Sequence, residues 1–100
     1  MAEKVYSLDE IGNIILPIIK KYKAEQAILF GSYARNEADE DSDIDVMVIG
    51  GEAFEPTDIF CIADDIYKAM NKAVDVYEKR EINNDSEFYK TIMREGVVLQ

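Results

Sequence analysis

Histidine is absent from this sequence, and cysteine occurs once, at Cys61. The lack of imidazole excludes ordinary zinc sites and mechanisms that use histidine as a general acid or base. A single cysteine excludes an internal disulfide. No apolar run approaches the roughly 20 residues that a membrane-spanning helix needs. The opening residues, MAEKVYSLDE, are too polar and acidic for a signal or transit peptide, so we expect a cytoplasmic protein.

Basic residues are also scarce. The chain has 11 lysines and arginines against 21 aspartates and glutamates, which gives a net charge of −10. Because nucleic-acid binding depends on basic surfaces that release counterions from phosphates, this balance argues against stable nucleic-acid binding. It leaves open a site where metal ions screen the carboxylates before a polyphosphate binds.

The residues that are present fit one domain over 1–100, since the chain is short and 48% of it is apolar. Its hydrophobic pattern predicts helices at 8–23 and 57–71, a third between Asp85 or Ser86 and Gly96, a short helical turn at 31–36, and strands at 27–30, 43–49, 73–77 and 97–99. We therefore predict an α/β (α+β) fold in which a small mixed sheet of four to five strands is flanked by helices.

Two of these helices carry local signals. The first begins with an S-x-x-E capping box at Ser7 and Glu10. Pro17 lies within it and predicts a kink or a division into two shorter helices. In the helix at 57–71, we expect Cys61 to be buried or partly buried.

Two carboxylates interrupt the strand at 43–49, where apolar residues alternate with Asp43 and Asp45. The strand period of two places both on one face, with Cβ atoms about 6–7 Å apart. Their repulsion raises the pKa of each carboxyl group and destabilises the fold unless a cation compensates it. Mg²⁺ prefers such oxygen ligands, together with water and substrate phosphates. Asp75, which interrupts the strand at 73–77, is the candidate third ligand and would allow two ions.

Gly31 and Ser32 end the strand at 27–30, and ten residues separate Ser32 from Asp43. Glycine leaves the backbone accessible, and free N–H groups at the start of a helical turn bind anions. The Ser32 hydroxyl adds a further donor. An anion site beside a metal site suits a nucleoside triphosphate, whose phosphates bind both.

The combination of G-S-Y-A-R, the ten-residue spacing, S-D-I-D and a later V-D-V resembles the minimal nucleotidyltransferases of the DNA polymerase β superfamily. The resemblance covers most of the chain and implies their polymerase-β-type fold. It implies that Asp43, Asp45 and Asp75 are catalytic and hold two Mg²⁺ ions on ATP, with Asp75 as candidate general base. It implies that Gly31 and Ser32 bind the β and γ phosphates.

Arg35, the last residue of G-S-Y-A-R, has two interpretations. It contacts a phosphate, or it braces the acidic loop through a salt bridge. Asn36 stands where family members often have glycine. Because asparagine tolerates a left-handed backbone, we expect the turn to keep its shape.

The resemblance also implies a function, namely transfer of AMP from ATP onto a hydroxyl group. Small stand-alone members are often encoded beside a helical HEPN-domain protein, and some act as antitoxins that transfer AMP onto a tyrosine of that partner. We therefore expect ATP and a HEPN-type protein as partners, in a homo- or hetero-oligomer. One alternative is a non-catalytic antitoxin that neutralises a partner by occupying its surface. A less favoured alternative is a small-molecule nucleotidyltransferase of the antibiotic-modifying type.

Overall fold

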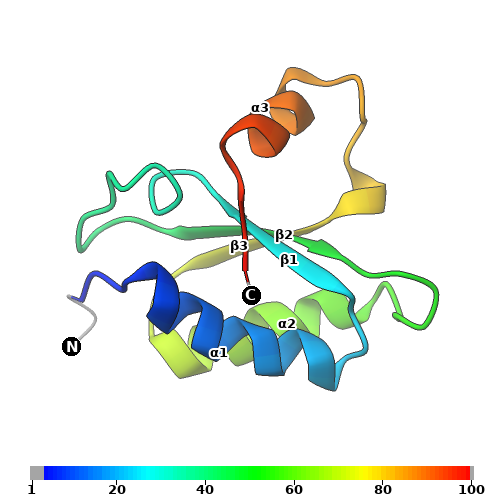
Figure 1. Ribbon diagram of the computed structural model, residues 1–100. Helices are drawn as coiled ribbons and strands as arrows, with labels where there is room; N and C mark the ends of the chain where they lie inside the picture. Colours follow the sequence, from blue (N-terminus) through cyan, green and yellow to red (C-terminus); the bar gives the residue numbers. More distant parts are fainter. Residues whose placement is uncertain (1–3, 100) are drawn as a thin grey trace.

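The computed structural model describes residues 4–99. Its elements are α1 (Leu8–Lys21), β1 (Gln26–Phe30), β2 (Ile44–Ile49), α2 (Asp58–Met70), β3 (Val74–Glu78), the 3₁₀ helix η1 (Lys79–Glu81), α3 (Glu87–Glu95) and β4 (Val97–Val98) (Figure 1). The predicted order of helices and strands is confirmed, except that η1 was not predicted and residues 31–36 form turns without a regular helix. Gly31 and Asn36 both have positive φ, and this breaks the helical dihedrals at either end of the segment.

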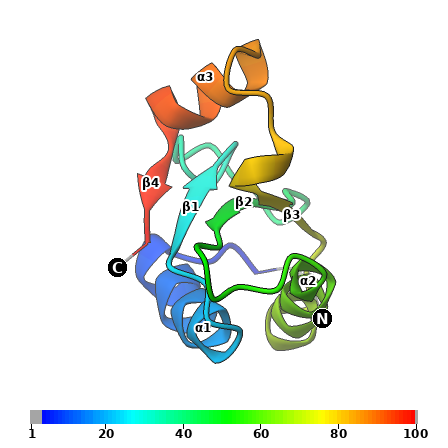
Figure 2. The same cartoon turned by 90° about the vertical axis from the view of Figure 1, so that its right-hand side faces the viewer.

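The strands form one mixed sheet in the order β3-β2-β1-β4. β1 runs antiparallel to β2 and β4, whereas β2 and β3 are parallel and are joined through α2. Figure 2 shows α1 and α2 side by side beneath the sheet and α3 above it. The predicted fold class, a small mixed sheet flanked by helices, is therefore confirmed, with four strands.

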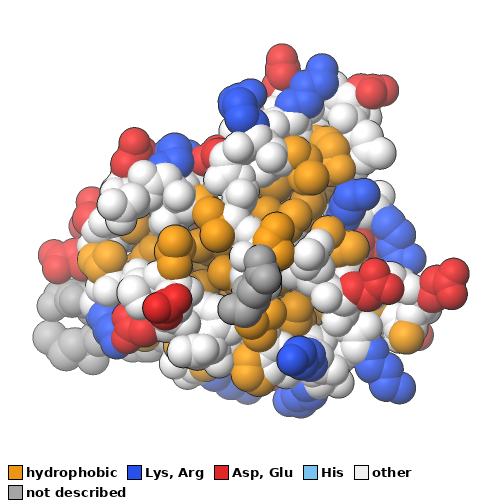
Figure 3. All heavy atoms as spheres, viewed as in Figure 1, with side chains coloured by type: hydrophobic (Ala, Val, Ile, Leu, Met, Phe, Trp, Pro, Cys, Tyr) orange, Lys and Arg blue, Asp and Glu red, His pale blue; other side chains and the backbone are white. Residues whose placement is uncertain are grey.

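Alternation along β2 divides the apolar residues between the two faces of the sheet. Ile44, Val46 and Val48 are fully buried in the core that the sheet forms with α1 and α2. Met47 points the other way and packs with Phe30 and other apolar residues beneath α3. Figure 3 shows hydrophobic side chains gathered across the middle of the molecule, between α3 and α1. The odd-numbered positions of β2 therefore face the side covered by α3.

α1 begins at the predicted capping box. The Ser7 hydroxyl accepts the Glu10 N–H at 3.1 Å, and the Glu10 carboxylate accepts the Ser7 N–H at 2.9 Å. Pro17 lies inside α1, which nevertheless runs unbroken over 14 residues. The expectation of two shorter helices is wrong, because Ile15 and Ile19 on either side of the proline are both buried in the core and hold the helix against the sheet. Among residues 4–99, no helix has the length and apolarity to cross a bilayer.

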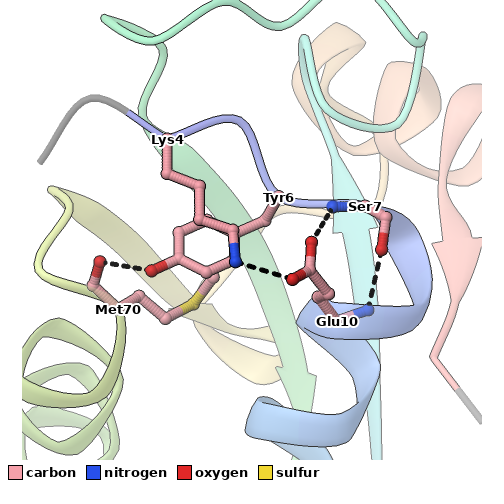
Figure 4. A network of polar contacts seen from close by, with 5 residues as sticks. All are labelled: Lys4, Tyr6, Ser7, Glu10 and Met70. Carbon is pink, nitrogen blue, oxygen red and sulfur yellow. Dashed lines mark hydrogen bonds and ion pairs between the residues drawn. The ribbon is translucent and has the colours of Figure 1, made fainter.

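The segment before α1 is tied to the end of α2. The Tyr6 hydroxyl donates to the Met70 carbonyl at 2.8 Å, and the Lys4 ammonium pairs with the Glu10 carboxylate at 2.7 Å (Figure 4). Because β3 begins soon after Met70, this contact also fixes where the chain enters β3.

The core stripe of α2 consists of Ile62, Ile66 and Met70, which follow one another at intervals of four. Cys61 therefore lies off the stripe and is exposed, so the expectation that it is buried is wrong. At the start of α3, Ser86 is the cap, and its hydroxyl accepts the Tyr89 N–H at 3.0 Å.

Candidate active site

Asp45 and Asp75 lie directly opposite one another on neighbouring strands. In the parallel pairing of β2 with β3, the two residues are register partners. Partners in register point to the same face of a sheet, which here is the face covered by α3. Thirty residues separate the two aspartates in sequence, and the β2-α2-β3 crossover brings them together.

Asp43 lies just outside β2, which begins at Ile44. Because Asp43 lies two residues before Asp45, its side chain is directed to the same face of the sheet, and it is exposed. The charge of Asp43 raises the pKa of Asp45, as expected of neighbouring carboxylates. The structure thus gathers the three predicted carboxylates at one end of β2 and β3.

The Asp45 carboxyl group has a perturbed pKa. Burial raises it first, and the charges of Asp75 and then Asp43 raise it further, to about 6. The Asp75 carboxylate can also accept a hydrogen bond from protonated Asp45, which raises the pKa of Asp45 further. The positive charge of Arg35 acts in the opposite direction. A carboxylate held in this way, partly buried beside two others, is a typical candidate for a functional site.

Gly31 is packed against Asp45. Its φ is +77°, and a Cβ atom at this position would lie 2.4 Å from the Asp45 Oδ2. Any other residue would therefore meet both a left-handed backbone and a steric clash with the carboxylate. The glycine lets the turn at 31–36 touch the acidic pair directly.

The turn that follows Gly31 uses its carbonyl groups internally. The Gly31 carbonyl accepts the Arg35 N–H at 3.1 Å, and the Ser32 carbonyl accepts the Glu37 N–H at 2.9 Å. No hydrogen bond among residues 4–99 uses the N–H groups of Ser32, Tyr33 or Ala34. Those N–H groups therefore form the kind of cradle that binds phosphate oxygens. Asn36, with φ of 60°, takes the expected left-handed conformation.

Arg35 is engaged in ion pairs. Its Nε lies 2.9 Å from the Glu37 Oε1, and its Nη1 lies 2.8 Å from the Glu95 Oε2 at the end of α3. Of the two interpretations of Arg35, the structure shows the salt bridge that braces the acidic loop, formed with Glu37. The second ion pair, with Glu95 on α3, was not predicted from the sequence. A phosphate contact remains a prediction.

Lys72 is a member of this region that the sequence analysis missed. Its side chain reaches back from the start of β3 and donates to the carbonyl oxygens of Glu40 at 2.7 Å and Ser42 at 3.3 Å. Only 6% of Lys72 is exposed, which is rare for lysine. Its ammonium group holds the end of the acidic loop immediately before Asp43. The only signal in the sequence was a lysine two positions before an apolar strand.

An aromatic cluster lies beside the carboxylates on the same face. The ring centroids of Phe30, Tyr77 and Phe88 lie 5.3–5.8 Å apart. Burial raises the pKa of the Tyr77 hydroxyl, and the charges of Asp75 and Asp45 raise it further. The cluster joins α3 to the sheet on the face that carries the acidic pair.

The donor set suits Mg²⁺, since it consists of carboxylate oxygens next to a phosphate cradle. The repulsion that raises the pKa of Asp45 is the kind that a divalent cation relieves. As the side chains stand, no three carboxylates within residues 4–99 are grouped closely enough to hold one ion. Asp43, Asp45 and Asp75 therefore supply the donor chemistry that the ion prefers without forming a finished site.

Comparisons with known proteins agree with this geometry. A family model described as polymerase beta, nucleotidyltransferase matches residues 13–100. A relative in Methanocaldococcus jannaschii, named as a predicted protein adenylyltransferase, is 38% identical over 77 residues, which cover 77% of this chain and 83% of the relative.

Two solved structures share the fold. A toxin–antitoxin complex with AMP-PNP contains a chain with a TM-score of 0.76 and 22% identity, covering 89% of this chain and 72% of that one. A complex of a tri-AMPylated HEPN toxin of Shewanella oneidensis with its MNT antitoxin gives a TM-score of 0.71 and 20% identity, covering 93% of this chain and 71% of that one. The expected resemblance to minimal nucleotidyltransferases is confirmed. Since the family model extends over β1, β2 and β3, which carry the acids and the glycine turn, the chain belongs to the polymerase beta nucleotidyltransferase family and is an enzyme of that class.

Proposed function

We propose that this enzyme is a Mg²⁺-dependent adenylyltransferase that moves AMP from ATP onto a tyrosine hydroxyl of a HEPN-type partner protein. The observation that carries the proposal is the Asp45–Asp75 pair, in register on parallel strands and in contact with the Gly31 turn. The name of the archaeal relative and the two toxin–antitoxin complexes support AMP as the transferred group and a HEPN toxin as the acceptor.

Two groups of residues bind the triphosphate, one through its phosphate oxygens and the other through the metal ion. The free N–H groups of the turn after Gly31, with the Ser32 hydroxyl, bind the β and γ phosphates and orient the pyrophosphate as a leaving group. Asp43, Asp45 and Asp75 are the residues that would hold Mg²⁺. The bound ion supplies positive charge that stabilises the negative phosphates and the departing pyrophosphate.

The chemical step is an in-line displacement at the α phosphorus. The acceptor hydroxyl oxygen forms a bond to that phosphorus, and the bond from phosphorus to the bridging oxygen breaks, so pyrophosphate leaves. Asp75, exposed on the edge strand β3, accepts the hydroxyl proton. Arg35 sits at the junction of the turn and α3, where a phosphate oxygen would compete with Glu37 and Glu95 for its guanidinium.

The test is transfer of label from [α-³²P]ATP in the presence of Mg²⁺ and the protein encoded by the neighbouring reading frame. We expect labelling of a tyrosine, located by mass spectrometry. Asp45→Asn and Asp75→Asn should each lower the rate at least about a hundredfold, as does loss of other groups that act in a transition state. Asp41→Asn, which removes an exposed carboxylate of the loop, is the matched control and should keep its activity. Equal labelling by Asp45→Asn and the wild type would refute the proposal.

A second candidate is neutralisation of the partner by binding alone. It is favoured by the observation that no three carboxylates within residues 4–99 stand ready to share an ion. The Asp43→Asn/Asp45→Asn double variant separates the two candidates in a toxicity assay with the neighbouring gene. Retained rescue of growth supports binding, and loss of rescue supports catalysis.

A further inference from the structure

A hollow of about 420 Å³ opens at the β3 edge of the sheet, between the start of α2 and η1. Its apolar lining includes Ile59, Phe60, Val76 and Tyr77. Its two acidic lining residues are Glu81, which is exposed, and Glu78, which is buried and paired with Arg80. It is separate from the residues proposed above to bind ATP, none of which lines it.

Phe60 is the unusual residue of this hollow. It is 75% exposed, more than any other large hydrophobic side chain described in residues 4–99. It lies off the α2 core stripe and so contributes little to folding. An exposed aromatic side chain beside an apolar hollow is typical of a protein-binding site.

The hollow and the candidate active site share the edge of β3. Tyr77 belongs both to the lining of the hollow and to the aromatic cluster beside the carboxylates, whereas Val76 points to the opposite face of the sheet from Asp75. β3 is an edge strand of the sheet that residues 4–99 form, and within these residues no further strand separates the hollow from Asp75. A second hollow, lined in part by Leu8 and Val98, opens at the opposite edge beside β4. Three strand spacings, about 14 Å, separate that edge from β3.

The charge around the hollow restricts what can bind there. Glu81, an exposed residue of the lining, forms no ion pair among residues 4–99. The whole chain carries a net charge of −10. Both facts favour a partner surface that presents apolar side chains flanked by lysine or arginine.

We propose that the β3-edge hollow is the docking site of the acceptor protein, which inserts an apolar or aromatic side chain against Phe60 and places its hydroxyl group at Asp75. This inference rests on the proposed transfer to a protein, because it assigns where that protein binds. Docking at β3 brings the acceptor to the open side of the acidic pair. Docking at β4 would leave the hydroxyl group at the opposite edge of the sheet, three strand spacings from β3.

The test compares Phe60→Ala with Val98→Ala, a truncation of a residue that is 37% exposed at the opposite edge. The probe is the protein encoded by the neighbouring reading frame, and its affinity is measured by calorimetry without ATP. We expect Phe60→Ala to weaken binding at least about tenfold, as for the loss of an aromatic anchor, and Val98→Ala to leave it unchanged. Glu81→Lys should weaken it as well. In transfer assays, Phe60→Ala should raise the KM for the acceptor protein encoded by the neighbouring reading frame. It should leave the KM for ATP within about twofold of the wild-type value.

Equal affinity of the wild type and Phe60→Ala overturns the docking site, as does an equal loss in Val98→Ala. Failure of the wild-type chain to bind the probe also overturns it. Binding that depends on Phe60 without AMP transfer leaves the docking site standing and refutes the proposed activity. AMP transfer at the same rate and KM in Phe60→Ala as in the wild type leaves the proposed activity standing and refutes the docking site. Thermal unfolding of each variant confirms that the exposed side chains were removed without loss of the fold.

Discussion

Replacing Asp45 with asparagine should stabilise the protein in the absence of divalent ions. Asp45 is partly buried and close to the charges of Asp75 and Asp43, and its pKa is raised from the ordinary value of 3.8 to about 6. Folding at neutral pH must therefore move an ionised carboxylate into a place where the charged form is disfavoured. The asparagine side chain would keep the shape of the aspartate and remove its charge, so the repulsion disappears without leaving a cavity.

The size of the effect follows from the pKa. The difference between 3.8 and about 6 corresponds to about 3 kcal/mol of free energy. Because Asp45 is only partly buried, solvent screens some of the repulsion, and we expect a gain of about 1–2 kcal/mol in the free energy of unfolding.

The raised pKa also determines the direction in which the free energy of unfolding changes with pH. A carboxyl group whose pKa is higher in the folded state binds its proton first when folded, so lowering the pH through about 6 stabilises the wild type. The advantage of Asp45→Asn should therefore be full at pH 8, shrink below about pH 6, and vanish below the ordinary value of 3.8.

Urea unfolding at pH 8.0, 6.0 and 4.5, in buffer with EDTA, measures this difference. Asp41→Asn on the exposed loop is the matched control and should change stability by less than about 0.5 kcal/mol at each pH. Added Mg²⁺ should stabilise the wild type more than Asp45→Asn, since only the wild type keeps the full set of carboxylates. If Asp45→Asn is destabilised at pH 8, or if its advantage grows as the pH falls, the electrostatic reasoning is wrong.

Two further predictions concern the residues around the acids. Gly31→Ala places a Cβ atom against the Asp45 carboxylate on a left-handed backbone, so it should lower stability by about 1–3 kcal/mol in urea unfolding and lower AMP transfer; unchanged stability would contradict the close contact. Lys72→Met leaves two loop carbonyls without their donor and frees the loop at 40–42, so it should raise the Mg²⁺ concentration needed for half-maximal transfer, whereas Lys72→Arg should restore much of the effect. A normal Mg²⁺ requirement in Lys72→Met would mean that the loop does not position Asp43.

The parts of the fold that depend on local patterns were predictable from the sequence. Alternation in β2 gave the two faces of the strand correctly, since Val46 lies in the core with α1 and α2 while Asp45 faces α3. The caps at Ser7 and Ser86 were recognisable for the same reason, because capping is decided within one turn of helix. The same alternation indicated that Asp43 and Asp45 share a face.

The parts that depend on distant contacts were not predictable. The ion pair of Arg35 with Glu95 joins residues 60 apart, and the bonds of Lys72 to the acidic loop span 30 or more. No short-range pattern reports such pairs. The expectation that Cys61 is buried or partly buried failed because the core stripe of α2 runs through Ile62, Ile66 and Met70, and Cys61 lies beside that stripe. Which side of the helix faces the core depends on packing against distant elements.

The position of β3 at the edge of the sheet has a consequence for how the site is held together. Among residues 4–99, β3 pairs only with β2, whereas β1 and β2 each have a neighbour on both sides. Edge strands open locally at a lower free energy than central strands, and each such opening would carry Asp75 away from Asp45. The carboxylates proposed to be catalytic are thus divided between a stable strand and a less stable one. A ligand that bridges Asp45 and Asp75 would hold β2 and β3 together and stabilise the edge strand. The amide protons of β3 should therefore exchange with solvent more slowly when the site is occupied.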